Sequence, residues 1–234
     1  MTFLELCRAA YTRIGYSGAG PSAVTDQSAQ SARVVDYVEQ AWLEIQRSRE
    51  NWKFMLRRFD QVTEPGITHL ALPSTEVAKG DVIRSVEKDS WYVRGETEKT
   101  SARLCYLPAD HRRAIEESDE HYTGRPNYFW HDRKSVRVSP TPDRAYRITG
   151  DYYITPQTFA SSDGADNRQR ELSQKVPEMP EEYHIAIVWL AVRSLAAFEG
   201  DGNAFQMADG EYRKLFNQIC TTELPTIRYG APLA

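Results

Sequence analysis

Apolar residues recur at helical spacing in two segments near the N-terminus. Between Thr2 and Ile14 they fall three or four positions apart, which predicts a short amphipathic helix that ends at Gly15. A longer helix is predicted from about Asp26 or Ser28 to Glu50, because its apolar positions form one stripe and its charged positions the opposite face. The stripe consists of Val34, Val38, Ala41, Trp42 and Ile45.

The middle of the chain has a different texture, with short runs of branched and aromatic residues separated by Pro, Gly and polar breaks. Such runs are typical of strands. One short helix is predicted within Pro108–Ser118, and Ala160–Lys175 is predicted to be a polar loop. The predicted strands are Phe54–Val62, Ile67–Leu72, Asp81–Val86, Trp91–Val93, Ala102–Leu107, Tyr128–Trp130, Ser135–Ser139 and Tyr146–Ile154.

Two further helices are predicted near the C-terminus. Pro180 stands where a first helical residue is expected, and Tyr183–Phe198 is apolar nearly all round, so this helix should be the most buried one. The sharp break at Gly200–Gly202 separates it from a last helix. The apolar stripe of that last helix consists of Phe205, Ala208, Tyr212, Leu215, Phe216 and Ile219.

Helices at both ends and strands between them predict an α+β fold. The simplest arrangement is a four-helix unit formed by both chain ends, with a large β-rich insertion of antiparallel strands between the helix pairs. The predicted boundaries are 1–51 for the N-terminal helical half, 52–178 for the insertion, 179–220 for the C-terminal helical half and 221–234 for an extended tail.

Composition narrows the class of protein. With 234 residues, 41% apolar and 26% charged, the chain can bury a core as one domain or one domain with an insertion. A net charge of -4 argues against a protein that mainly grips nucleic acid, although not against one that surrounds DNA. No apolar run is long enough to cross a membrane. The three separated cysteines predict buried free thiols.

No motif in the chain points to catalysis. The loop Gly15–Gly20 lacks the Lys-Ser/Thr of a phosphate-binding loop, and the five histidines are not spaced as metal ligands. Adjacent acids such as Glu181 and Glu182 point to different faces of a helix, which makes them poor acid–base pairs. We therefore predict no catalytic residue, no cofactor and no metal.

Two surface features allow more than one interpretation. Basic residues interleave with aromatic ones at the end of the second helix, as in a nucleic-acid groove or as in a salt-bridged helix end beside core aromatics. The chain also has 13 tyrosines, several on predicted strands, which serve interfaces and sheet cores equally well. The basic residues are Arg47, Arg49, Lys53, Arg57 and Arg58.

A run of short motifs between Gly124 and Ile219 resembles the head-to-tail connector (portal adaptor) proteins of tailed bacteriophages. The opening short helix, the Gly-rich loop and the long Trp-containing helix are also similar, so the resemblance covers almost the whole chain. The motifs are Gly124-Arg125-Pro126, the strand ending in Pro140-Thr141-Pro142-Asp143, the Tyr-rich strand Tyr146–Pro156, the helix entry Met179-Pro180-Glu181-Glu182-Tyr183, and Glu211-Tyr212.

The resemblance implies a structural virion protein of the neck or tail, assembled in the bacterial host cytoplasm. Copies would form a ring, commonly a dodecamer, under the portal protein, and packaged DNA would pass through without specific binding. The tail would dock on the portal, and the β-rich insertion would face tail tube, nozzle or fibre proteins. The docking residues implied for the tail are Leu224, Ile227, Arg228, Tyr229 and Leu233.

A second hypothesis is a binding module whose β-rich region recognises a glycan or a fibre protein through exposed aromatic residues. An enzyme carried by the particle is a third hypothesis, which the absence of a catalytic motif disfavours. The candidate aromatic contacts are Trp91, Tyr92, Tyr128 and Trp130.

Overall fold

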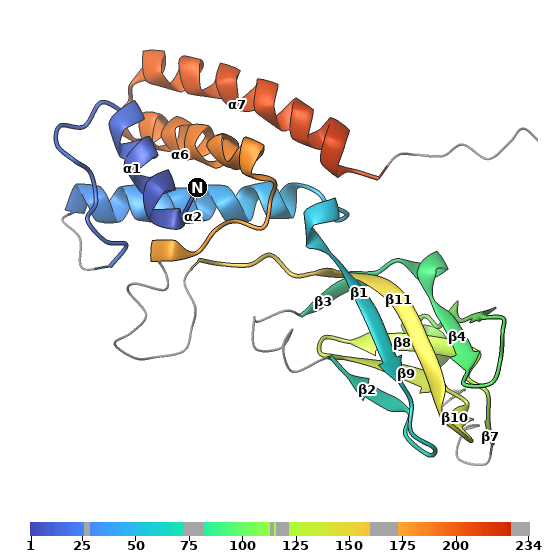
Figure 1. Ribbon diagram of the computed structural model, residues 1–234. Helices are drawn as coiled ribbons and strands as arrows, with labels where there is room; N and C mark the ends of the chain where they lie inside the picture. Colours follow the sequence, from blue (N-terminus) through green and yellow to red (C-terminus); the bar gives the residue numbers. More distant parts are fainter. Residues whose placement is uncertain (26–28, 73–81, 113–114, 116–121, 160–172, 226–234) are drawn as a thin grey trace, which may run out of the picture. The chain divides into compact units, whose positions relative to one another are not determined.

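The computed structural model describes residues 1–25, 29–72, 82–112, 115, 122–159 and 173–225. The chain divides into two compact units (Figure 1). The helical unit comprises Met1–Phe54 and Pro156–Ala234, and the β unit comprises Met55–Thr155. The predicted α+β class, with helices at both ends and a β-rich middle, is confirmed.

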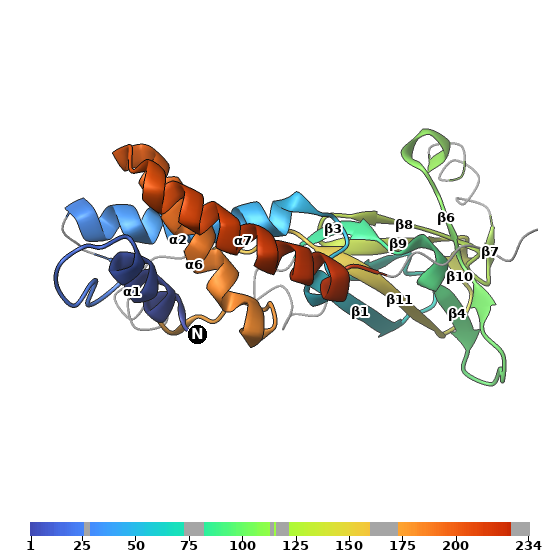
Figure 2. The ribbon, with the colours of Figure 1, turned by 90° about the horizontal axis from the view of Figure 1, so that it is seen from above.

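The described part of the helical unit includes three α-helices that pack on a central one. The helices are α1 (Phe3–Arg13), α2 (Ala29–Ser48), α6 (His184–Glu199, entered through the 3-10 turn η3, Glu181–Tyr183) and α7 (Gly202–Glu223). Helix α6 packs against α1 and α2 on one side and α7 on the other, as Figures 1 and 2 show. It buries residues all round, which confirms the prediction that it is the most buried helix. The predicted stripe of α2 is buried in full.

Local signals fix the helix ends. Thr2 and Glu5 form a capping box: the Thr2 hydroxyl accepts from the Glu5 amide at 3.3 Å, and the Glu5 carboxylate accepts from the Thr2 amide at 2.8 Å. Gly200 ends α6 in the left-handed conformation, with φ 76°. The Asp201 carboxylate then accepts from two amides at the start of α7, both at 3.0 Å. Helix α7 runs to Glu223, so it extends beyond the predicted end at 220.

The chain after the β unit packs on the helices well before Pro180. Phe159 stacks on Phe3 with ring centroids 4.1 Å apart, and the Gln157 backbone hydrogen-bonds the Gln46 side chain. The Phe3 amide donates to the Lys175 carbonyl at 2.7 Å. These contacts place the boundary at Thr155/Pro156, whereas the predicted insertion ran to 178.

In the residues that the structure describes, the β unit contains two sheets and a short strand pair. The first sheet has the order β1 (Leu56–Val62), β11 (Tyr146–Ile154), β4 (Tyr92–Gly95) and β5 (Ala102–Arg103), and β3 (Ile83–Val86) also pairs with β11. The second sheet has the order β2 (His69–Ala71), β9 (Ser135–Ser139), β8 (Tyr128–Asp132) and β6 (Cys105–Tyr106). Strands β7 (Thr123–Gly124) and β10 (Thr141–Pro142) form a parallel pair, and the 3-10 turn η2 (Lys88–Ser90) precedes β4. A second 3-10 turn, η1 (Lys53–Met55), spans the boundary between the two units.

One predicted strand is divided between the two sheets. The segment Ala102–Leu107 forms β5, which pairs with β4, and β6, which pairs with β8 in parallel. Leu104 lies between them and is fully buried, and Cys105 beside it is exposed. The prediction of a buried thiol is therefore wrong for Cys105, since adjacent residues in extended chain point to opposite sides. The helix predicted within Pro108–Ser118 lies partly outside the described residues.

An aromatic stack fills the core of the β unit. The Trp91 ring stacks on Phe129 of the second sheet at 4.4 Å and contacts Phe59 of the first sheet at 5.3 Å between centroids. All three side chains are buried. Gly150 lies opposite Phe59 in the β1–β11 register and leaves the space that the Trp91 ring occupies. The core therefore joins the inner faces of both sheets.

Candidate functional site

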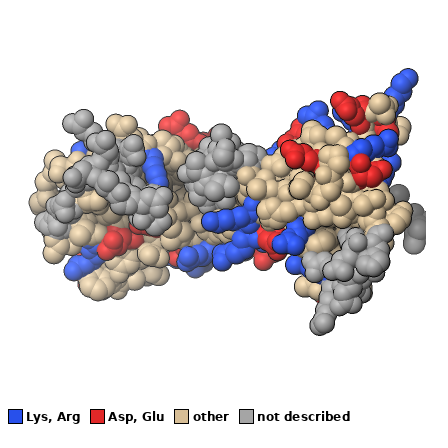
Figure 3. Space-filling model, turned by 90° about the horizontal axis from the view of Figure 1, so that it is seen from below, with Lys and Arg blue, Asp and Glu red and all other residues tan. Residues whose placement is uncertain are grey.

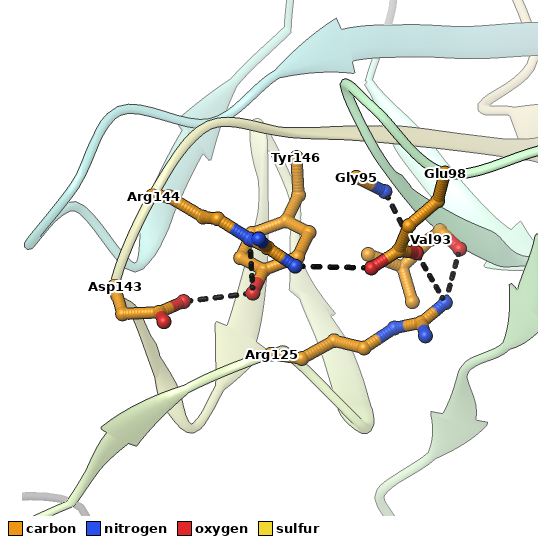
Figure 4. A network of polar contacts seen from close by, with 7 residues as sticks. All are labelled: Val93, Gly95, Glu98, Arg125, Asp143, Arg144 and Tyr146. Carbon is orange, nitrogen blue, oxygen red and sulfur yellow. Dashed lines mark hydrogen bonds and ion pairs between the residues drawn. The ribbon is translucent and has the colours of Figure 1, made fainter.

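Residues from three of the sequence motifs meet in one polar network of the β unit, the loop clamp (Figure 4). Arg125 belongs to the Gly-x-Pro motif before β8, Asp143 ends the Pro-x-Pro-Asp motif, and Tyr146 begins β11. Two further residues complete the clamp: Arg144, which follows Asp143, and Glu98, which lies in the turn between β4 and β5. No signal in the sequence pointed to Glu98, because it lies in an ordinary polar turn.

Glu98 is the centre of the loop clamp. Its carboxylate accepts from the Gly95 amide at 3.1 Å and from Arg144 at 3.0 Å, and it lies 3.4 Å from the Arg125 guanidinium. Arg125 also donates to the Val93 carbonyl at 3.0 Å. One carboxylate thereby fastens the loop before β8 and the loop before β11 to the β4–β5 turn.

Tyr146 connects the clamp to the sheet. Its hydroxyl donates to the Asp143 carboxylate at 2.7 Å and accepts from Arg144 Nε at 3.1 Å. Burial raises the pKa of Tyr146, and so does the hydrogen bond to Asp143, so the hydroxyl keeps the proton that it donates. The clamp contains no nucleophile paired with a base. Its hydrogen bonds and ion pairs hold three loops in fixed positions, as the supporting residues of a protein-binding surface do.

The four predicted aromatic contacts have two different environments. Trp91 and Trp130 are 0% and 4% exposed, so neither can offer a contact surface on the folded chain. Trp91 is held in the core because Gly150 makes room for its ring, and its Nε1 donates to the Asp151 carbonyl at 3.2 Å. Tyr92 and Tyr128 are 40% and 39% exposed, on β4 and β8.

The helical unit exposes apolar side chains on both sides of the α6–α7 turn. Phe198 lies in the last turn of α6, and Phe205 and Met207 lie in the first turns of α7; all three are exposed. Phe198 is partly covered by the Arg33 guanidinium, 4.5 Å from the ring centroid. Only Ala208, Tyr212 and Ile219 of α7 are buried, because α7 packs mainly on one helix. The predicted stripe therefore includes Phe205, which the fold leaves exposed.

The basic cluster after α2 and the predicted tail contacts were the remaining candidates from the sequence. Within the helical unit, the Lys53 ammonium donates to the Thr222 carbonyl at 2.5 Å, and Arg49 lies 5.9 Å from the Phe216 ring centroid. The acids near the basic cluster have other partners, since Glu44 pairs with Arg193 and Asp60 with Arg147. Leu224 follows α7 and is half-buried, and the other predicted tail contacts (Ile227, Arg228, Tyr229 and Leu233) lie outside the described residues.

His184 is the most buried histidine described. Its Nε2–H donates to the Met179 carbonyl at 2.8 Å, which fixes the segment that enters α6. Burial lowers the pKa of His184, so the ring is neutral at pH 7. In the part of the chain that the structure describes, no three His, Cys, Asp or Glu side chains gather closely enough to hold a metal ion. No described helix is both long and apolar enough to span a bilayer.

Comparison with known proteins supports the connector hypothesis. The model of one family, the SU10 adaptor protein, matches residues 1–234. The chain belongs to this family. The adaptor is therefore a structural phage protein with a role between head and tail, and the suspected connector relationship is confirmed. A search of curated proteins found no match to the adaptor.

Proposed function

We propose that the adaptor forms a ring that docks under the portal protein, joins the portal to tail proteins and surrounds the channel through which DNA leaves. The observation that carries this proposal is the family match over the full 234 residues. The two-unit architecture supports it, because one unit can pack in a ring while the other contacts a different partner.

Contacts between neighbouring copies are assigned to the exposed apolar residues beside the α6–α7 turn. Exposed aromatic and Met side chains are enriched in protein interfaces. A ring needs two different patches on each copy, since each subunit contacts its neighbours head to tail. Phe198, Phe205 and Met207 supply one such patch. Charge changes here, for example Phe205→Glu with Met207→Glu, should prevent ring closure and leave the helical content unchanged.

Electron microscopy of the adaptor mixed with the portal protein of the same genome tests the proposal. The expected result is an additional ring on the narrow end of the portal, whose symmetry gives the copy number. Portal rings that remain undecorated at high adaptor concentration would contradict it. Deletion of 225–234 should weaken docking, whereas the helices stay intact because α7 ends before the deletion.

A second candidate function is recognition of a fibre protein or a glycan by the β unit. The exposure of Tyr92 and Tyr128 favours it, since tyrosine supplies rigid contact area at low entropy cost. Tyr92→Ala and Tyr128→Ala should each reduce binding of purified fibre protein or of host glycans on an array. Unchanged binding by the double variant would exclude these two residues.

A further inference from the structure

The outward face of the first sheet carries four arginines on four adjacent strands. Alternation along each strand puts Arg58 of β1, Arg147 of β11, Arg94 of β4 and Arg103 of β5 on the side away from the buried core. All four residues are exposed. The strand register places Arg147 directly opposite Arg94, which is an unfavourable pairing of like charges.

Aspartates of the same chain pair with two of the four arginines. Asp60 binds Arg147 with two hydrogen bonds of 2.7 and 2.5 Å, and Asp89 pairs with Arg103. The hydrogen bond from Arg147 lowers the pKa of Asp60, with further lowering by the nearby charges of Arg58 and Arg94. Neither Arg58 nor Arg94 forms a hydrogen bond or ion pair with any residue that the structure describes. The guanidinium groups of Arg58 and Arg94 can therefore each donate two parallel N–H groups to a ligand.

The open arginines line a hollow of about 320 Å³, the arginine hollow. Asp60 and Arg147 lie beside them, and the lining is completed by Tyr92, Ser101 and Thr149. Ser101 and Thr149 offer hydroxyl donors, and the exposed Tyr92 offers a ring and a hydroxyl. Most of these residues stand on paired strands, so their backbone positions are fixed before any ligand arrives.

We propose that the arginine hollow docks a carboxylate-bearing segment of another protein, with Arg58 and Arg94 as its anchors. A guanidinium presents parallel N–H groups that match a carboxylate in two-pronged fashion. The face already shows arginine–carboxylate pairing twice, at Asp60–Arg147 and Asp89–Arg103. An acidic segment that brought two carboxylates would repeat it at the open positions and remove the repulsion between Arg94 and Arg147.

Duplex DNA fits this face less well. Asp60 lies within the hollow and Asp89 on the same face, and both would repel a phosphate backbone. Figure 3 shows acidic side chains standing among basic ones on the β unit, whereas DNA-binding surfaces gather basic residues in a continuous stripe. The whole chain carries a net charge of -4. The carboxylate partner is therefore the one that the charges favour.

A deca-glutamate peptide is the probe, and NMR of the arginine side chains reads out where it binds. Titration into the ¹⁵N-labelled full chain at low salt should shift the Nε–Hε signals of Arg58 and Arg94. The double variant Arg58→Gln/Arg94→Gln should lower affinity about tenfold for each arginine lost. Arg58→Lys/Arg94→Lys keeps the charge but loses the paired N–H groups, so its affinity should lie between that of the Gln double variant and that of the wild type.

Matched controls separate this site from general charge attraction. Arg133→Gln/Arg137→Gln removes the same charge from the second sheet and its adjoining turn, and should keep affinity within about twofold of wild type. Equal losses in both double variants, or no binding of the peptide, would overturn the proposal. Tighter binding of a 20-base-pair duplex that is lost in the Arg58/Arg94 variants would also overturn it and assign the face to DNA. The test uses the isolated chain, so its result is independent of ring formation.

Discussion

Among the glycines that the structure describes in the β unit, Gly150 leaves the least room for an added Cβ. A Cβ at this position would lie 2.2, 2.4 and 2.7 Å from Cδ2, Cε2 and Cε3 of Trp91. Carbon atoms pack at about 3.5–4.0 Å, so the indole would have to retreat by more than about 1 Å. It cannot do so freely, because Phe129 stacks on it at 4.4 Å and Phe59 packs beside it at 5.3 Å. Gly150→Ala therefore strains a fully buried ring stack.

Overpacking of this kind lowers the free energy of unfolding by about 1–3 kcal/mol. We expect Gly150→Ala to lie at the upper end, about 3 kcal/mol, because both rings beside Trp91 restrict its movement. Hydrogen exchange followed by mass spectrometry measures the loss of stability in the β unit separately from the helical unit. Amides of β1 and β11 should exchange about 100-fold faster in the variant, since 1.4 kcal/mol is a factor of ten. Amides of α6 should be unaffected, because α6 belongs to the other compact unit and local unfolding follows such units.

Two controls define the refuting result. Gly210 lies inside α7, where an added Cβ would meet no atom within 4 Å, so Gly210→Ala should stabilise the helical unit by about 0.5–1 kcal/mol. Trp91→Leu should be destabilising alone but should cancel most of the added cost of Gly150→Ala. If Gly150→Ala leaves β-unit exchange within about twofold of wild type, or if the two changes are additive, the steric argument is wrong.

The remaining predictions concern single polar groups. Glu98→Ala should accelerate hydrogen exchange in the loops that carry Arg125 and Arg144 and cost about 1 kcal/mol, because the pairs are partly exposed; unchanged loop exchange would contradict the clamp. Burial lowers the folded-state pKa of His184, so stability is full above the unfolded value near 6.5 and is lost as pH falls below it. His184→Gln should flatten the fall in melting temperature between about pH 6.5 and pH 5, whereas the exposed His69→Gln should not. Thr2→Ala should cost about 1 kcal/mol in the melting of the helical unit, and a change below about 0.3 kcal/mol would show that the capping box is unimportant.

The helices could be predicted closely because their signals are local. Thr2 and Glu5 define the start of α1, Gly200 and Asp201 define the α6–α7 turn, and the stripe of α2 is a repeating pattern within one segment. Each of these signals depends on residues less than one or two turns apart. The order of strands in the chain could be predicted for the same reason.

The arrangement of strands could not be predicted, because it depends on partners far apart in the sequence. Nothing near Leu104 indicates that the chain changes sheets there, and nothing near Gly150 indicates that Trp91 fills the space above it. The same dependence on distant partners explains why Trp91 and Trp130 were expected to be exposed but are buried. An aromatic residue on a strand has the same sequence signature whether it faces a partner or the core.

The candidate site was predicted only in part. The motifs that contain Arg125, Asp143 and Tyr146 stood out in the sequence, but their convergence around Glu98 did not, since Glu98 is separated from each of them by more than 25 positions. The arginine hollow was also missed. Its members lie in pairs on β1, β4 and β11, with Ser101 just before β5, and only the register of the sheet brings them together.

The pairing of β1 with β11 has a consequence for how the protein can change over time. The chain leaves the helical unit into β1 and returns from β11, and these strands are antiparallel neighbours from Leu56–Tyr153 to Val62–Arg147. The first and last residues of the β unit therefore lie side by side, as the ends of an insertable cassette must. One recombination event could replace the whole cassette without altering the order of α1, α2, α6 and α7 in the chain. Related phages could in this way exchange the β unit while keeping the helical unit unchanged.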